Sequence, residues 1–243
     1  MRPDTPLAWS PDGRRIAFSA RTGLDAVSER SEIYLASPDE GSVERLTAEE
    51  TGAGQTDPCW DPSGRSLVFG LPPFSGFPPD DEVYLRQVDL ATRQVTKVAG
   101  SEGLWSPKCA RDGEILAKDL FAQRAHFDER PAKGRDFFKV RDPASGRWRA
   151  LTVDLTMEPV VRLFGHLGYP AWSRDGRSVY AQRRLPRRAV VRFDATTGRL
   201  DSLVDVDGLG GSSDWMTIDP TGAPLVHRDV SEREIVMMDF ERR

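Results

Sequence analysis

A five-residue motif recurs along this chain and limits its fold more than any other feature. Its clearest copy, Trp-Ser-Pro-Asp-Gly, occupies residues 9–13. Four more diverged copies occupy residues 60–64, 109–113, 172–176 and 218–222. Pro suits the second position of a type I turn, Asp or Ser suits the third, and Gly adopts the left-handed conformation that closes a bulged hairpin. Each copy therefore predicts a tight turn between two strands.

The spacing of the copies indicates the kind of repeat to which they belong. Alternating apolar residues follow each turn, as in Ile16 and Phe18 or Leu67 and Phe69, and predict a strand that leaves it. A third strand, a second polar turn and a fourth strand come next in most units. The copies lie 46 to 63 residues apart, near the roughly 40–50 residues of a four-stranded propeller blade. One blade cannot bury both of its faces, so the blades must stack around an axis.

We therefore predict an all-β fold, a β-propeller that forms a single domain over residues 1–243. The five predicted blades cover residues 5–47, 55–98, 105–152, 168–204 and 212–240. The last blade lacks its outer strand, which leaves residues 234–239 as an unpaired edge and predicts an incomplete or open ring. Trp9, Trp60 and Trp172 occupy equivalent positions, and we expect all three to be buried between blades.

Residues 6–47 carry a Pro, then Trp-Ser-Pro-Asp-Gly, a short apolar strand, and then Ile-Tyr and Arg-Leu-Thr. This pattern resembles the repeat of TolB-like propellers, and weaker copies cover almost all of the chain. Residues 100–107 and 225–231 resemble, more narrowly, the propeller half of bacterial proteins in which it follows a winged-helix or Ser/Thr-kinase domain. The chain departs from the family pattern at Cys109 and Ile218, where the family has Trp or another large residue. It also departs at Arg111 and Arg174, where the family has Pro.

Charge and composition argue against several classes of protein. Lys and Arg number 34 against 38 Asp and Glu, a net charge of −4, which argues against a nucleic-acid-binding protein. No apolar run is long enough to span a membrane, and the first residues lack the apolar core of a signal peptide. We therefore expect a cytoplasmic protein, or a periplasmic one if the true N-terminus lies upstream.

The two cysteines are Cys59 and Cys109. Cys109 is in the register of Trp60, whereas Cys59 lies one residue before that register, so their side chains are expected on opposite faces of their strands. We therefore expect no disulfide, and predict that both are small, buried, apolar residues.

The long connections of the predicted blades are the first candidate for a binding surface. The strands alternate in direction, so the short turns gather on one face of the disc and the long connections on the other. Binding residues on rigid β scaffolds are usually found on such loops. The candidates on this face are Phe74, Phe77, Trp105, His126 and His166. The alternative is that these loops are insertions without a function.

Three acidic residues, Asp57, Glu102 and Asp214, lie at or just before an innermost strand, where each could reach the channel. Converging carboxylates could hold a hard cation such as Ca²⁺ or act as an acid/base pair. These residues are therefore the candidate metal ligands, and the alternative is that they are solvated acids at the channel mouth. No other cofactor is expected.

The chain has three His residues and no Gly-x-Ser-x-Gly motif. We therefore predict a non-enzymatic propeller that binds a protein, a peptide or a small ligand, as the resemblance to TolB-like sensor or scaffold modules implies. Two alternatives stay open. One is the detached gating propeller of a prolyl-oligopeptidase-like hydrolase, a family that carries similar repeats. The other is a glycosidase that acts through the channel carboxylates.

Overall fold

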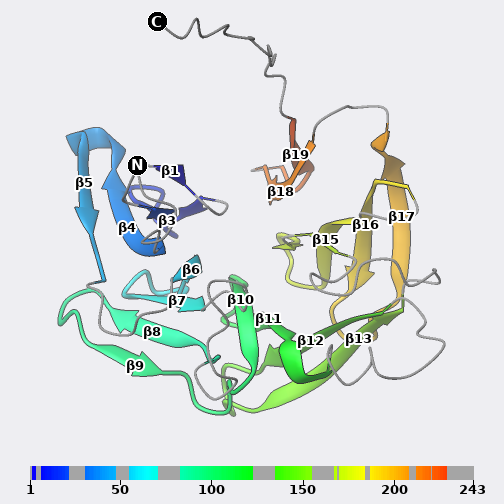
Figure 1. The fold of residues 1–243 in the computed structure, drawn as a ribbon, viewed down its shortest axis with the longest axis horizontal. Helices are drawn as coiled ribbons and strands as arrows, with labels where there is room; N and C mark the ends of the chain where they lie inside the picture. Colours follow the sequence, from blue (N-terminus) through cyan, green and yellow to red (C-terminus); the bar gives the residue numbers. More distant parts are fainter. Residues whose placement is uncertain are drawn as a thin grey trace, which may run out of the picture.

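The computed structural model describes residues 2–3, 7–21, 31–47, 55–70, 83–122, 135–154, 167–168, 170–183, 187–207, 212–219 and 221–228. These residues form five antiparallel β-sheets that follow one another around a common axis (Figure 1). The innermost strands lie near the axis and the outermost strands lie at the rim. The predicted all-β propeller is therefore confirmed.

Four of the sheets are complete blades. Blade 1 contains β1 (Arg2–Pro3), β2 (Ala8–Trp9), β3 (Ile16–Arg21), β4 (Ser31–Ser37) and β5 (Ser42–Arg45), with the 3-10 helix η1 (Pro38–Glu40) before β5. Blade 2 contains β6 (Thr56–Trp60), β7 (Ser66–Gly70), β8 (Arg86–Asp89) and β9 (Val95–Lys97). Blade 3 contains β10 (Leu104–Cys109), β11 (Ile115–Asp119), β12 (Arg135–Arg141) and β13 (Trp148–Asp154). Blade 4 contains β14 (Ala171–Trp172), β15 (Ser178–Arg183), β16 (Ala189–Asp194) and β17 (Leu200–Asp205).

Only part of the fifth unit lies within the described residues. Within the described residues it contributes two strands, β18 (Ser212–Ile218) and β19 (Pro224–Arg228), which pair with each other. The strand predicted over residues 234–239 lies outside the described residues. The described part of the chain therefore contains four full blades and a two-stranded sheet, not five blades. No helix in this part of the chain is long and apolar enough to cross a membrane.

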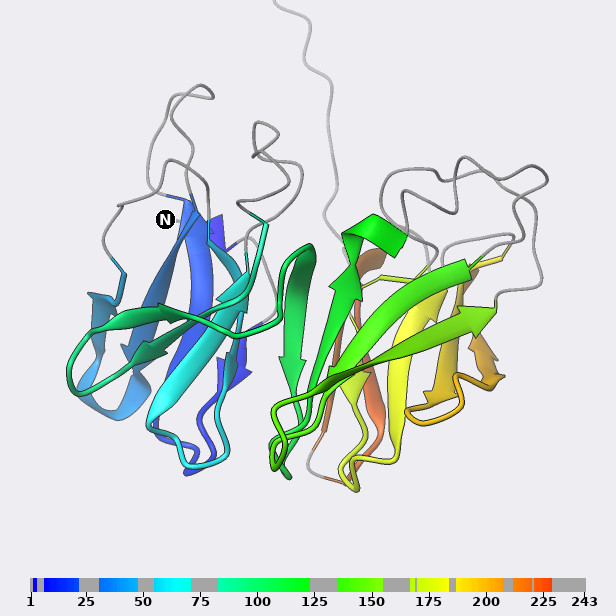
Figure 2. The same cartoon turned by 90° about the horizontal axis from the view of Figure 1, so that it is seen from below.

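The turns of the recurrent motif have the expected chemistry. In blade 1 the Gly13 N–H donates to the Ser10 carbonyl (2.9 Å), and the Ser10 hydroxyl donates to Asp12 Oδ1 (2.6 Å). Gly13 has a φ of 71°, in the left-handed region that only Gly adopts without cost. The hydroxyl of Ser10, with the backbone N–H of Arg14, lowers the pKa of the Asp12 carboxyl. The turns that follow β2, β6, β10 and β14 lie along the lower edge of Figure 2.

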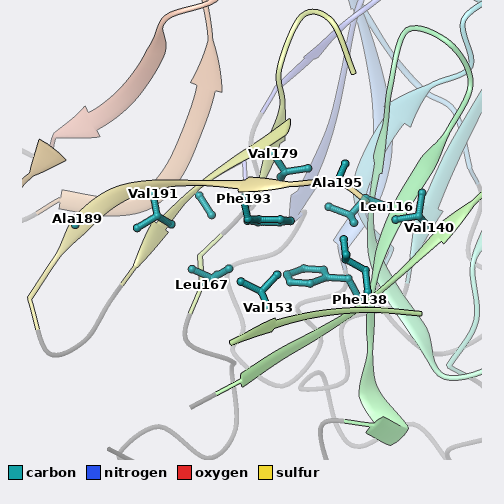
Figure 3. Packing of buried hydrophobic residues seen from close by; sticks show 12 residues of the cluster. Leu116, Phe138, Val140, Val153, Leu167, Val179, Ala189, Val191, Phe193 and Ala195 are labelled. Carbon is teal, nitrogen blue, oxygen red and sulfur yellow. The ribbon is translucent and has the colours of Figure 1, made fainter. Parts of the chain in front are cut away.

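Apolar side chains fill the space between neighbouring blades. Between blades 3 and 4, the rings of Phe138 from β12 and Phe193 from β16 stack with centroids 5.5 Å apart. Figure 3 shows these two rings pointing toward one another, with Val153, Leu167 and Val191 around them. Similar clusters join blades 1 and 2 and blades 2 and 3. The core of the protein therefore lies between blades, and each blade is stabilised by its neighbours.

The three tryptophans of the motif do not share one environment. Trp60 is buried, with 6% of the residue exposed, and its Nε1 donates to the Ala8 carbonyl of the preceding blade (2.8 Å). Trp172 is partly buried, and its Nε1 donates to the Lys108 carbonyl of blade 3 (2.8 Å). Trp9, in contrast, is 56% exposed, so the expectation of burial is wrong for this residue. Trp60 and Trp172 each face a preceding blade in the described structure, whereas Trp9 belongs to the first blade.

The packing between blades also predicts that substitution of Gly198 destabilises the protein more than substitution of Gly41. Gly198, between β16 and β17, and Gly41, before β5, have positive φ angles of 72° and 62°. A Cβ atom at Gly41 would meet no atom within 4 Å, whereas one at Gly198 would overlap the Thr152 carbonyl oxygen of blade 3. We expect Gly41→Ala to cost about 1–2 kcal/mol for its left-handed backbone, and Gly198→Ala to cost a further 1–3 kcal/mol or so from overpacking. Urea denaturation of the two variants measures the difference, and equal losses would contradict this packing.

Candidate functional site

A cavity of about 290 Å³ lies in the central channel, at the end where the innermost strands run into their turns. Its walls come from all five sheets, through β2, β6, β10, β14 and β18 and the residues next to them. The first residues of the turns after β10, β14 and β18 complete its rim. The cavity therefore lies on the short-turn side of the disc, opposite the long-loop face on which we predicted the binding residues.

Cys59 and Cys109 form a disulfide in the wall of this cavity, with Cα atoms 5.5 Å apart. The expectation of two unlinked cysteines is therefore wrong. That expectation assumed that side chains on opposite faces of their strands cannot meet. The assumption holds only for two strands of the same sheet. Adjacent blades, however, are stacked so that one face of blade 2 is packed against the opposite face of blade 3. Cys59 accordingly belongs to the cluster between blades 2 and 3, where Cys109 packs, whereas Trp60 belongs to the cluster between blades 1 and 2.

Next to the disulfide, Asp57 is joined to Lys108 across the same pair of blades. The Lys108 Nζ donates to Asp57 Oδ1 (2.9 Å), and the two side chains are 15% and 2% exposed. Asp57 has a φ of 54° and lies in a β-bulge of β6, between the paired residues Thr56 and Cys59. The bulge interrupts the alternation of side chains between the two faces of β6. A buried carboxylate held by a lysine from the next blade is a link between blades, and its charge is already compensated.

The other two predicted carboxylates occupy different settings. Glu102 is exposed and pairs with Lys97 (2.8 Å), whose hydrogen bond lowers the pKa of the Glu102 carboxyl. The side chain of Asp214, in β18, lies outside the described atoms. Within the described ranges, no group of three or more His, Cys, Asp or Glu side chains is placed to hold a metal ion. The cation site formed by all three carboxylates therefore stays a prediction.

Of the predicted binding residues, only Trp105 is described. It is 6% exposed and packs with Val83 and Leu120, and the Lys118 Nζ lies 5.2 Å from the centre of its ring. Most of its surface is therefore used in contacts within the protein. The other four candidates lie outside the described residues: Phe74, Phe77, His126 and His166. The binding role of all five stays a prediction.

Two residues that we did not predict as site residues, Arg111 and Arg174, line the cavity at its rim. Each is the second residue of the turn that follows an innermost strand. The sequence carried a signal for them, since both replace the Pro of the repeat, but we treated that departure only as a weakened turn.

The carboxylates near the rim are engaged by their own turns. Asp175 Oδ1 accepts hydrogen bonds from the Ser173 hydroxyl (2.6 Å) and the Arg177 N–H (3.1 Å), which lower the pKa of this carboxyl. Asp219 Oδ1 accepts from the hydroxyl of Thr221 (2.7 Å) and the N–H of Ala223 (2.8 Å), which lower its pKa in the same way. Both carboxylates are therefore ionised near neutral pH and fixed within their turns.

Comparison with known proteins places this geometry in context. No protein-family profile matches the chain. The chain is similar in structure to TolB from Acinetobacter baumannii, with a TM-score of 0.59 and 21% identity over 89% of this chain and 46% of that one. A putative TolB from Agrobacterium tumefaciens gives a TM-score of 0.57 and 18% identity over 83% and 65% of the two chains. The chain has the TolB-like propeller fold.

Proteins named as enzymes share this similarity. A Xanthomonas campestris protein described as a gluconolactonase has a TM-score of 0.59 and 20% identity, over 91% of this chain and 68% of that one. Among curated proteins, an "Uncharacterized peptidase YuxL" of Bacillus subtilis is 26% identical over 159 residues. That match covers 63% of this chain and 22% of the relative. The expectation that the chain is not an enzyme is overturned by these names, which belong to a peptidase and a lactonase.

Proposed function

We propose that this TolB-like chain is the propeller part of a peptidase-type hydrolase, and that its channel admits and orients an extended peptide. The observation that carries the proposal is the cavity of about 290 Å³ in the channel, walled by strands from all five sheets. A volume near the lower limit of ligand pockets suits a segment of unfolded chain and excludes a folded domain. Selection by size is a task that a rigid propeller can perform.

The composition of the wall supports a peptide as the guest. Apolar surface comes from Ala8, Pro58 and Met216, and polar groups come from Ser173 and Thr217. A peptide has both kinds of surface. The relative named as a peptidase supports the same proposal, and the matched segment is 22% of its length. We therefore assign substrate selection to this part of the enzyme.

A channel-filling variant tests the proposal. We expect a fluorescein-labelled, unstructured peptide of about ten residues to bind the purified protein in an anisotropy assay. Ala171, in β14, lines the cavity. The side chain introduced by Ala171→Trp should therefore occupy the channel and weaken peptide binding about tenfold or more, because it removes contacts between the peptide and the cavity wall. The matched control is Val43→Trp on β5, where the residue is 55% exposed at the rim of the disc. Equal binding by the two variants, or no binding by the unaltered protein, would contradict the proposal.

The disulfide carries a further proposal about the compartment. Disulfides persist in oxidising compartments such as the bacterial periplasm and are rare in the cytosol. Because Cys59 and Cys109 are joined, we propose that the protein works in such a compartment, in place of the cytoplasmic location that we expected from the sequence.

A further inference from the structure

Neighbouring blades meet at their innermost strands through one recurring pair of positions. The first residue of the turn motif in one blade contacts the residue that precedes the motif in the blade before it. Between blades 1 and 2, Trp60 Nε1 donates to the Ala8 carbonyl (2.8 Å). Between blades 3 and 4, Trp172 Nε1 donates to the Lys108 carbonyl, also at 2.8 Å. The first motif residue of a blade is therefore covered by the innermost strand of the blade before it.

The Cys59–Cys109 disulfide joins the same pair of positions between blades 2 and 3. Blade 1 and the sheet of β18 and β19 form the two ends of the ring (Figure 1). At these ends, the first motif residue of blade 1 is Trp9, and the residue before the motif in β18 is Thr217. We propose that Trp9 and Thr217 make a contact of the same kind, and that the ring exchanges between the open form of the structure and a closed form in which blade 1 packs against the β18–β19 sheet.

Blade 1 presents an apolar surface at its end of the ring. Trp9, Ile16 and Ala36 are paired across β2, β3 and β4, so their side chains lie on one face of the blade. Trp9 is more than half exposed, and the other two residues are partly exposed. The equivalent row of blade 2 is buried against blade 1 and consists of Trp60, Leu67 and Val88. This comparison indicates that the row in blade 1 is suited to contact with another blade.

The β18–β19 sheet presents the matching surface at the other end. Thr217 pairs with Leu225 across the two strands, so their side chains lie on one face, where Thr217 is exposed and Leu225 is half exposed. Met216 and Val226 lie on the opposite face and pack with Val190 of blade 4. The face with Thr217 therefore points away from blade 4, toward the position of the next blade in the ring.

Both ends of the ring line one cavity. Leu7 and Ala8 of blade 1, and Thr217 and Ile218 of β18, belong to the wall of the channel cavity. Closure removes apolar surface at both ends from water. It also supplies a carbonyl acceptor to Trp9 Nε1, which has none within the described residues. The open form is the major one, since Trp9 is exposed in it, so the closed contact adds little to the overall free energy of unfolding.

An engineered cysteine pair tests the closed form in the purified protein. Trp9→Cys with Thr217→Cys reproduces, at the two ends of the ring, the pair of positions that Cys109 and Cys59 occupy. Under oxidised glutathione, we expect this pair to form a disulfide within one chain, because the cross-link traps the closed form whenever the ring adopts it. Peptide mapping by mass spectrometry identifies the pairing, and a denaturing gel without reductant shows whether one chain or two are joined.

A second pair keeps the indole of Trp9. Ile16→Cys with Leu225→Cys uses the positions that correspond to Ile115 and Val68, which pack in one cluster between blades 2 and 3. A short bismaleimide should join these two thiols within one chain. This pair also covers the case in which the loss of Trp9 itself prevents closure.

The control places the second thiol away from the opening. Leu203 lies on β17, the outer strand of blade 4, and is exposed like Leu225. Each test pair should react about tenfold or more faster than Trp9→Cys with Leu203→Cys, because the contact gives its thiols a high effective concentration. A lack of intramolecular cross-linking in both test pairs, or an equal rate in the control, would overturn the closed form. Cross-links between two chains would also overturn it and would assign the surface of blade 1 to a second copy.

Discussion

Replacing Trp60 with Ala is expected to lower the free energy of unfolding by about 3–5 kcal/mol, the usual cost of truncating a buried aromatic side chain. Trp60 is 6% exposed and packs in the cluster between blades 1 and 2. Its Nε1 donates to Ala8 O of blade 1, and the Arg15 guanidinium lies 5.0 Å from the centre of the ring. The truncation would therefore remove apolar contacts and leave the Ala8 carbonyl without this donor.

Trp9→Ala is the matched control, because Trp9 has the same place in the motif but is 56% exposed. We expect it to cost about 0.5 kcal/mol or less, as for most surface changes. Trp60→Phe keeps the apolar ring and should lose about 1 kcal/mol, the contribution of a typical hydrogen bond. Urea denaturation followed by circular dichroism measures all three, since tryptophan fluorescence is itself altered. Similar losses for Trp9→Ala and Trp60→Ala would contradict the difference in packing.

Removal of the disulfide is the second large effect. We expect the double variant Cys59→Ser with Cys109→Ser to lose about 4 kcal/mol of unfolding free energy, because the cross-link restricts a long loop of the unfolded chain. The two cysteines are 50 residues apart in the sequence and lie on the innermost strands of adjacent blades. The variant removes both sulfurs, so no free thiol remains to form another pairing.

A reductant provides the control for this prediction. Under a reductant such as dithiothreitol, the unaltered protein should unfold at nearly the urea concentration at which the double variant unfolds. The double variant itself should show no response to the reductant. Thermal unfolding with and without the reductant gives the same comparison. An unaltered protein that is as stable reduced as oxidised would contradict a stabilising cross-link between blades 2 and 3.

The candidate site could be predicted from the sequence only in part. The substitution of Pro by Arg at residues 111 and 174 is visible as a break in the repeat, but the repeat does not say that both side chains line one cavity. Asp57 was predicted to reach the channel, whereas its carboxylate pairs with Lys108, which lies 51 residues further along the chain. Turn positions follow from local residue preferences, whereas side chains around a channel are brought together by the stacking of whole blades.

Local chemistry alone was enough to predict the propeller. Gly and Asp in the turn motif, as in Asp12-Gly13, and alternating apolar residues such as Ile16 and Phe18 act over a few residues, so their pattern could be interpreted without a structure. Only the tertiary structure determines how neighbouring blades pack against each other. The Cys59–Cys109 bond, the exposure of Trp9 and the cavity at the short-turn end all depend on which face of one blade is packed against which face of the next. That relation involves residues about 50 positions apart, and the alternation within a single strand does not contain it.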